Sequence, residues 1–311
     1  MSESWLVTGA LGCIGAWIVR TLVREGIPVA AFDLGDDVSR LDLIMEPDEL
    51  ERVILVPGDV TELAELGRAL DEHQVTHVVH LAALLIPLAR ADPERGALVN
   101  VVGTTNVFEA VKQRRERIRG LAYASSAAAY DVVDAQQALR NEAAVGHPTT
   151  LYGVHKLANE GTARVYWTED GLPSIGLRPH IVYGPGRDTG MTAGPTLAMA
   201  AAVRGEPYTI GWSSRSTFNY APDAARAFVD AARAATSGAA VYNIPGANVP
   251  MSEVVSAITA EVPGARISYE DVALPFPEEF ATGGLPMPVT ALRQGVRETV
   301  EVFRSRPRAR M

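Results

Sequence analysis

The chain has 311 residues and a formal net charge of −9; 47% of the residues are hydrophobic and 21% are charged. A chain of this length and composition can bury a large core, so we expect a folded protein with one large domain or two lobes. The negative charge disfavours nucleic acid or an anionic membrane surface as the main partner.

Cysteine use and hydropathy favour a cytoplasmic protein. Cys13 is the single cysteine, so no internal disulfide is possible and a reducing compartment is expected. Residues 1–5 lack the basic start and apolar run of a signal peptide. The longest apolar stretch, residues 81–89, contains Pro87 and is far shorter than the ~20 residues that cross a bilayer. We therefore expect no membrane partner.

Short apolar runs alternate with longer amphipathic stretches over the first 180 residues. The apolar runs predict strands at 5–8, 28–33, 53–57, 77–81, 120–125 and 174–177. The amphipathic stretches predict helices at 13–25, 63–72, 93–117 and 149–169. This alternation predicts an α/β fold, with a Rossmann-type, doubly wound parallel sheet. Residues 53–56 and 78–81 are almost continuously apolar, which predicts strands buried on both faces.

A glycine-rich loop follows the first predicted strand and opens the first predicted helix, as a dinucleotide-binding loop does. Gly9 permits a tight turn, Gly12 lets the backbone approach a pyrophosphate, and Gly15 lets the helix pack close to the sheet. The helix N-terminus offers N–H groups and partial positive charge to phosphates. The alternative is a glycine-rich turn without a ligand. The cofactor contacts predicted here are Gly9, Leu11, Gly12, Cys13, Ile14 and Gly15.

Two carboxylates refine the choice of cofactor. Asp33 ends the second predicted strand, where it can accept hydrogen bonds from adenosine ribose hydroxyls and would repel a 2′-phosphate. No lysine or arginine follows it before Arg40, so NAD is favoured over NADP. Asp59 and the adjacent Val60 follow the third predicted strand, where the aspartate could reach the adenine amino group. A plain turn residue is the alternative for Asp59.

Tyr152 and Lys156 stand four residues apart on a predicted helix and so share one of its faces. A phenol titrates near 10 in water and is a poor base at neutral pH. An ammonium about 4 Å away contributes roughly 4 kcal/mol at an effective dielectric of 20. A similar energy brings the pKa down to about 7. We therefore predict that Lys156 turns Tyr152 into a general base.

The pattern loosens beyond about residue 179, where proline and glycine become frequent. Helices are expected at 192–203, 222–235 and 252–262, separated by short strands. We interpret residues 1–178 as an NAD-binding Rossmann domain that also carries the catalytic groups. Residues 179–311 form mainly a smaller, irregular substrate-binding lobe, with some segments returning to the main sheet.

Four motifs together resemble the extended short-chain dehydrogenase/reductases, the NAD-dependent epimerase/dehydratase family. They are residues 8–15, 80–83, 123–126 with Tyr152 and Lys156, and 177–186. The resemblance covers nearly the whole chain. It implies that Tyr152 is the acid/base, that Lys156 also binds the cofactor ribose, and that Ser126 orients the substrate oxygen. Ser125 is the weaker candidate for that last role.

The resemblance implies further contacts. Those with the cofactor are Leu81, Ala82, Ala83, Asn100, Tyr152, Pro179, Ile181 and Val182. Those with the substrate are Leu85, Ser125, Ser126, His180 and Arg215. A histidine buried against backbone is the alternative for His180, and a locally satisfied helix residue is the alternative for Asn100. The histidines lack metal-ligand spacing, so no metal is expected.

Departures from the family pattern narrow the substrate. Ala127 and Ala128 replace the Asp-Glu pair of the 4,6-dehydratases, so a dehydratase is not expected. Sugar-nucleotide members bind the diphosphate with arginines. Arg215 lies near one such position, but residues 263–288 lack the usual Arg-x-x-Asp pattern and Arg266 is a poor substitute. Residues 220–223, Tyr-Ala-Pro-Asp, are similar to the threonine 3-dehydrogenases.

The expected function is hydride transfer between NAD and a secondary hydroxyl or ketone of a small polar substrate. A sugar, a sugar acid or a hydroxy-amino acid would fit. One alternative is a sugar or nucleotide-sugar epimerase with tightly bound NAD and a transient keto intermediate. Another is a non-catalytic NAD-binding scaffold. Family members commonly pair the helices corresponding to 93–117 and 149–169, so a homodimer is expected.

Overall fold

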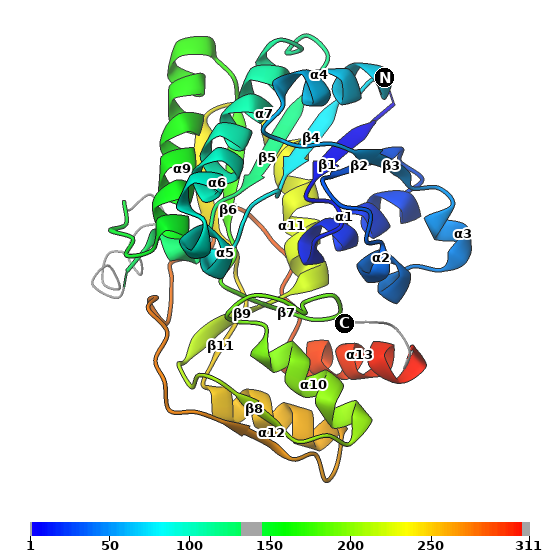
Figure 1. The fold of residues 1–311 in the computed structure, drawn as a ribbon, viewed down its shortest axis with the longest axis vertical. Helices are drawn as coiled ribbons and strands as arrows, with labels where there is room; N and C mark the ends of the chain where they lie inside the picture. The colour runs from blue at the N-terminus through cyan, green and yellow to red at the C-terminus, as the bar shows by residue number, and fades with distance from the viewer. Residues whose placement is uncertain (1, 132–144, 307–311) are drawn as a thin grey trace.

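A seven-stranded sheet forms the centre of the computed structural model, which describes residues 2–131 and 145–306 (Figure 1). The strands lie in the order β10-β6-β5-β4-β1-β2-β3, and all neighbours are parallel. The strands are β1 (Trp5–Thr8), β2 (Val29–Asp33), β3 (Ile54–Pro57), β4 (His77–His80), β5 (Gly120–Ala124), β6 (Ser174–Arg178) and β10 (Ala239–Asn243). Strand order reverses beside β1, so the predicted doubly wound Rossmann-type sheet is confirmed.

Helices cover both faces of the sheet (Figure 1). The pleat of β1 sends Val7 into one core and Leu6 into the other. The first core includes α1 and α11, and the second includes α4, α7 and α9. The helix bounds are α1 (Cys13–Arg24), α4 (Leu63–Glu72), α7 (Gly103–Lys112), α9 (Leu151–Asp170) and α11 (Ala221–Ala234). The helices bury both faces of the sheet, so a ligand can approach the strands at their ends.

The helix predicted at 93–117 is interrupted. It consists of α6 (Pro93–Ala97), a π-helical turn η1 (Leu98–Val102) and α7, which ends at Lys112. Asn100 lies in the π turn with 0% of its surface exposed. Its side chain accepts a hydrogen bond from the Leu84 N–H at 2.7 Å and donates one to the Leu84 carbonyl at 2.9 Å. The turn therefore anchors the loop that follows β4.

The prediction that residues 53–56 form a strand buried on both faces is wrong. They contribute to β3, which is an edge strand, and Ile54 and Leu55 are 39% and 50% exposed. The matching run in β4 is buried as predicted. Apolar runs alone do not distinguish a central strand from an edge strand, because the position in the sheet depends on how the other strands pair.

The C-terminal part of the chain forms two small sheets and three helices below the main sheet in Figure 1. One sheet has the order β11-β9-β7 and the other has the order β12-β8. Their bounds are β7 (Ile181–Tyr183), β8 (Tyr208–Ile210), β9 (Ser216–Tyr220), β11 (Ala247–Val249) and β12 (Ile267–Tyr269). The helices are α10 (Gly194–Arg204), α12 (Met251–Glu261) and α13 (Leu292–Ser305). Between these segments, α11 and β10 pack into the main fold.

Three short helices, α2 (Ser39–Ile44), α3 (Pro47–Leu50) and α5 (Ile86–Ala91), were not expected from the sequence. They are too short to show a clear apolar period. The α2 segment brings Arg40 beside the glycine loop, which matters for the site described below. Within the described ranges, no helix is long and apolar enough to cross a membrane.

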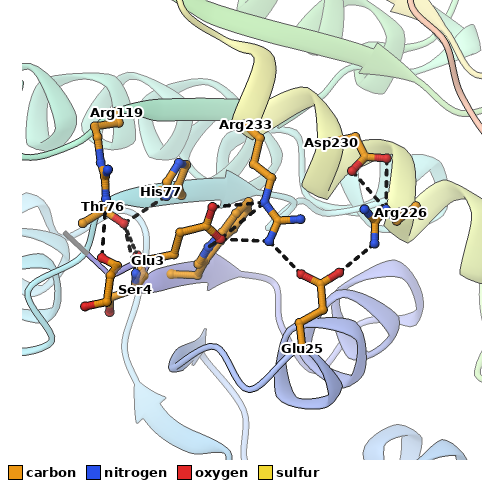
Figure 2. Close-up of polar contacts among 11 residues, drawn as sticks. Glu3, Ser4, Glu25, Thr76, His77, Arg119, Arg226, Asp230 and Arg233 are labelled. Carbon is orange, nitrogen blue, oxygen red and sulfur yellow. Dashed lines mark hydrogen bonds and ion pairs between the residues drawn. The ribbon is translucent and has the colours of Figure 1, made fainter.

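Polar contacts join α11 to Glu3, just before β1, and to Glu25, at the end of α1 (Figure 2). Arg233 pairs with Glu3 at 2.8 Å and with Glu25 at 2.7 Å. Arg226 also pairs with Glu25. The Trp5 ring stacks on His77 with 4.7 Å between ring centroids. The network lies at the sheet edge opposite the strand ends that carry the site, and each partly exposed pair contributes at most about 1 kcal/mol.

The free energy of unfolding should fall in mild acid. Burial lowers the pKa of His80 and of His180 to about 3, against about 6.5 in an unfolded chain. Between these values the unfolded chain binds more protons, so stability present at pH 7 is lost as the pH drops. Each histidine contributes a loss of about 2 kcal/mol between pH 7 and pH 5. Urea unfolding at both values should give a smaller difference for His80→Asn than for the wild type. Equal differences would contradict this.

Candidate active site

A cavity of about 700 Å³ lies at the carboxyl ends of the parallel strands. Gly9, Asp33, Leu81 and Ala124 line it where β1, β2, β4 and β5 end. This is the edge at which open α/β sheets bind ligands. Nearly all residues predicted from the sequence to contact cofactor or substrate line this one cavity.

Three of the predicted contact residues lie outside the cavity. Asn100 is used to hold the loop at Leu84, and Ile181 is fully buried in the core. Arg215, which directly precedes β9, is exposed and donates to the Asn248 carbonyl at 3.0 Å. The family resemblance implied that these residues contact the ligands, but packing in the second lobe and in the π turn directs their side chains elsewhere.

The glycine loop forms a concave cradle of backbone that a side chain at Gly9 or Gly15 would obstruct. Gly9 has φ of +68°, and a Cβ there would lie 2.7 Å from the Ala82 nitrogen. A Cβ on Gly15 would lie 2.2 Å from the Gly9 carbonyl oxygen. The Asp33 carboxylate accepts a hydrogen bond from the Leu11 N–H at 2.9 Å. This cradle, at the N-terminus of α1, fits a dinucleotide pyrophosphate.

Asp59 lies in the cavity wall, and its carboxylate accepts hydrogen bonds from two neighbouring residues. Arg95 donates to it at 2.8 Å and the Thr61 N–H donates at 2.9 Å. These contacts lower the pKa of Asp59 against the opposing effect of burial, which is the largest influence. A carboxylate has about four lone-pair sites, so Asp59 keeps acceptor capacity for an adenine amino group.

Tyr152 and Lys156 enter the cavity from the first turns of α9. The helix begins after Thr150, whose side chain accepts a hydrogen bond from the Gly153 N–H at 3.0 Å. Ser126, which follows β5, lies close enough to the Tyr152 hydroxyl to lower its pKa. The Lys156 ammonium donates to the Ala124 carbonyl at 2.7 Å and lies 5.5 Å from the centroid of the Tyr152 ring. The Ser, Tyr and Lys side chains predicted from the sequence therefore meet.

Burial dominates the titration of this cluster. It raises the pKa of Tyr152, although the Ser126 side chain and the charge of Arg187 both lower it. It lowers the pKa of Lys156 to about 8. The prediction that Lys156 depresses the pKa of Tyr152 is therefore wrong, because burial raises that pKa and Lys156 is not among the groups that oppose the rise. Both groups lose hydration in the cavity wall, which disfavours the charged form of each.

Ser125 lines the cavity, but its hydroxyl donates to the buried Glu160 carboxylate. Arg178 pairs with the same carboxylate at 2.6 Å. Ser125 thus takes part in a buried polar cluster behind the site. His180 is likewise engaged in a hydrogen bond, in this case with the backbone. Its Nδ1 accepts from the Thr217 N–H at 3.2 Å. Unlike Ser125, it keeps a second polar atom, Nε2, without a hydrogen-bond partner among the described residues.

Residues 5–245 match the model of the NAD dependent epimerase/dehydratase family. The chain belongs to that family. This assignment confirms the family predicted from the sequence motifs and makes the protein an NAD-dependent enzyme. The glycine cradle described above fits the cofactor that the family uses.

Individual relatives differ in their reactions. UDP-glucuronate 4-epimerase 6 of Arabidopsis thaliana is 31% identical over 186 residues, which are 58% of this chain and 40% of that protein. UDP-glucose 4-epimerase of Thermus thermophilus, solved with NAD, is 26% identical with a TM-score of 0.75 over 97% of this chain and 99% of that chain. A partial consensus L-threonine 3-dehydrogenase is 25% identical with a TM-score of 0.83 over 97% and 100% of the two chains.

The sequence analysis did not predict the role of the loop between β7 and α10. Residues 186–192 of this loop line the cavity. Asp188 accepts from Arg40 at 2.7 Å and 3.0 Å, and Arg40 also donates to the Leu11 carbonyl at 2.9 Å. The loop is thus held against the glycine loop. The charged Arg-Asp pair after a Gly-Pro-Gly turn at a strand end was the signal that could have identified it.

Replacing Asp188 with asparagine should weaken NAD binding roughly tenfold, because charge-assisted bonds that join two walls of the cavity are lost. Calorimetric titration with NAD measures the change. Glu206→Gln removes a carboxylate from an exposed pair with Arg204 and is the matched control. An unchanged Kd for Asp188→Asn would show that the loop does not depend on this ion pair.

Proposed function

We propose that the protein uses NAD to oxidise a secondary hydroxyl of a small polar substrate, or to reduce the corresponding ketone. The observation that carries the proposal is the convergence of Ser126, Tyr152 and Lys156 in the cavity that also holds the glycine loop. Acid–base groups and a cofactor cradle in one cavity are what such a reaction requires.

The residues around the cradle have the chemistry to hold NAD. Gly9, Gly12 and the N-terminus of α1 would bind the pyrophosphate, and Asp33 the adenosine ribose. Lys156 has three donors and spends one on Ala124, so two are left for ribose hydroxyls. The remaining proposed cofactor contacts are Leu11, Cys13, Ile14, Gly15, Asp59, Val60, Leu81, Ala82, Ala83, Pro179 and Val182.

In the proposed reaction Tyr152 accepts the proton of the substrate hydroxyl, and Ser126 donates a hydrogen bond to the same oxygen. Bound NAD would supply the hydride acceptor. Because burial raises the pKa of Tyr152, its basic form needs positive charge nearby, and Arg187 is the charge that opposes the rise. Leu85 and His180 lie in the cavity wall and are proposed to contact the substrate.

The assay is direct. Protein incubated with NAD and a panel of sugars, sugar acids and hydroxy-amino acids should produce absorbance at the NADH wavelength. No signal from a preparation that binds NAD would rule out net oxidation of these compounds. The same preparation would then be examined for epimerisation.

Epimerisation is the second candidate, because two of the relatives are named as UDP-sugar 4-epimerases. An epimerase would return the hydride to the opposite face of a transient ketone, so purified protein should retain NAD and invert a sugar carbon without NADH release. Nuclear magnetic resonance of the sugar detects this. The position of Arg215 outside the cavity favours a substrate without a diphosphate. A non-catalytic scaffold is disfavoured by the intact acid–base set.

We also propose a homodimer in which the π turn and α9 pair with their copies. Support comes from exposed apolar side chains on these elements. They are Leu98, Val102, Leu151, Val154 and Val165, at 39–48% exposed. Val154→Glu should convert the dimer to a monomer in analytical ultracentrifugation, because a buried charge would face an apolar interface. A wild-type monomer at micromolar concentration would contradict the proposal.

Two broader assignments complete the proposal. Residues 1–178 would be the NAD-binding domain and residues 179–311 mainly the substrate lobe, with α11 and β10 as the segments that return to the main sheet. The location in the cytoplasm, expected from the single cysteine, stays a prediction.

A further inference from the structure

Arg187 is a cavity-lining cation that the proposed reaction uses only through its charge. Its Nη2 donates to the Thr192 hydroxyl at 3.1 Å, and its Nε is buried without a hydrogen-bond partner among the described residues. Gly190 leaves room for the group, since a Cβ there would lie 3.3 Å from Nη2. The guanidinium therefore presents unused donors.

The other cations of the cavity wall have polar partners. Arg40 is paired with Asp188, Arg95 is paired with Asp59, and Lys156 donates to the Ala124 carbonyl. No ion pair of Arg187 occurs within residues 2–131 and 145–306. Its sequence neighbour Asp188 does not neutralise it, because both carboxylate oxygens of Asp188 face Arg40. Arg187 as a whole is partly buried, but its Nε is fully buried without a partner among the described residues, and a buried donor without a partner is costly until a ligand acceptor joins it.

The charge of Arg187 is felt at the reacting end of the cavity. It acts on the Tyr152 hydroxyl and opposes the effect of burial there. Leu85, proposed to contact the substrate, also borders Gly190, with its Cδ1 3.1 Å from the Cβ position. The same charge also acts on Cys13 of the glycine loop. Arg187 therefore lies within electrostatic reach of both Tyr152 and the glycine loop, and the experiment below separates a substrate role from a cofactor role.

A neutral donor accompanies this cation in the cavity wall. Because His180 Nδ1 accepts from the Thr217 N–H, the ring proton of the neutral imidazole is on Nε2. That Nε2 has no hydrogen-bond partner among the described residues and suits a ligand oxygen. One positive charge with a neutral donor matches a monoanion better than a phosphate dianion, which commonly recruits several cations.

We propose that Arg187 binds a carboxylate of the substrate, so that the natural substrate is a hydroxy acid or sugar acid rather than a neutral sugar. The inference rests on the proposed function, because it assigns the substrate of that same site. A planar guanidinium fork binds a carboxylate through two parallel hydrogen bonds. Arg187 would thereby select the substrate and orient its hydroxyl toward Tyr152.

Calorimetry on NAD-saturated protein tests this with matched acid and neutral ligands. The pairs are D-glucuronate with D-glucose and UDP-glucuronate with UDP-glucose. The wild type should bind the acid more tightly in at least one pair. Arg187→Gln should weaken that acid roughly 10- to 100-fold and leave its neutral partner unchanged. Arg187→Lys should recover part of the loss. Arg95→Gln, which removes another cavity cation, should leave the acid-to-neutral ratio unchanged.

Each other outcome overturns the proposal. A wild type without acid preference excludes a carboxylate site. Equal weakening of UDP-glucuronate and UDP-glucose would assign Arg187 to the diphosphate, and a raised Kd for NAD alone would assign it to the cofactor. Failure of the proposed function is seen separately, as acid binding without NADH production or epimerisation. A melting temperature for each variant identifies any general loss of folding.

Discussion

Replacing Tyr152 with phenylalanine is expected to lower kcat by about 10²- to 10⁴-fold, the range that a positioned acid–base group contributes. The phenyl ring fills the same partly buried space, while the hydroxyl beside Ser126 is lost. NAD binding should change little, because the glycine loop and Asp33 are untouched. Steady-state kinetics with the substrate found in the panel, together with an NAD titration of the same preparation, measure both quantities.

Tyr123→Phe is the matched control. Tyr123 is 1% exposed in β5, and its hydroxyl has no hydrogen-bond partner among the described residues. Removing that hydroxyl should leave kcat unchanged and the free energy of unfolding equal or slightly higher. If Tyr152→Phe also kept full activity, another residue would be the base.

Replacing Arg178 with methionine is expected to lower the free energy of unfolding by about 3–5 kcal/mol, the cost of breaking a buried ion pair from one side. Arg178 and Glu160 are 3% and 8% exposed, and two of their nitrogen–oxygen distances are 2.6 Å and 2.7 Å. Without Arg178 the Glu160 carboxylate would keep only the Ser125 hydroxyl of its two observed side-chain partners. Urea unfolding measures the loss.

Two comparisons isolate the buried pair. Arg204→Met removes the arginine of a pair whose side chains are 50% and 55% exposed, so its cost should stay below about 1 kcal/mol. The double variant Arg178→Met with Glu160→Leu should recover much of the stability, because neither charge is then buried alone. An equal loss in the single and double variants would attribute the effect to packing instead of charge.

The most local features of the site could be predicted from the sequence. The spacing of Gly9, Gly12 and Gly15 depends on a single strand–turn–helix unit, and the pairing of Tyr152 with Lys156 depends on a single helical turn. Such patterns need few long-range contacts to be correct. The alternation of strands and helices likewise predicted the parallel sheet, since βαβ units have one favoured handedness.

Features that depend on distant segments could not be predicted. Arg40 meets Asp188 although 148 residues separate them, and no spacing rule connects α2 with the loop after β7. The exposure of Ile54 followed from the edge position of β3, which strand pairing decided. The Ser125 hydroxyl points toward Glu160, to which it donates, and this residue of α9 is 35 positions away in the chain.

The amino-acid sequence by itself determined the fold class, the glycine loop and the shared helix face of Tyr152 and Lys156, because these follow from local periodicity and from residue types at short spacing. The tertiary structure decided which side chains share the cavity and which charges remain uncompensated there. Arg187 is the clearest case. Its availability as an anion-binding group arises because Asp188, the nearest carboxylate in the chain, is taken by Arg40 from the other side of the cavity.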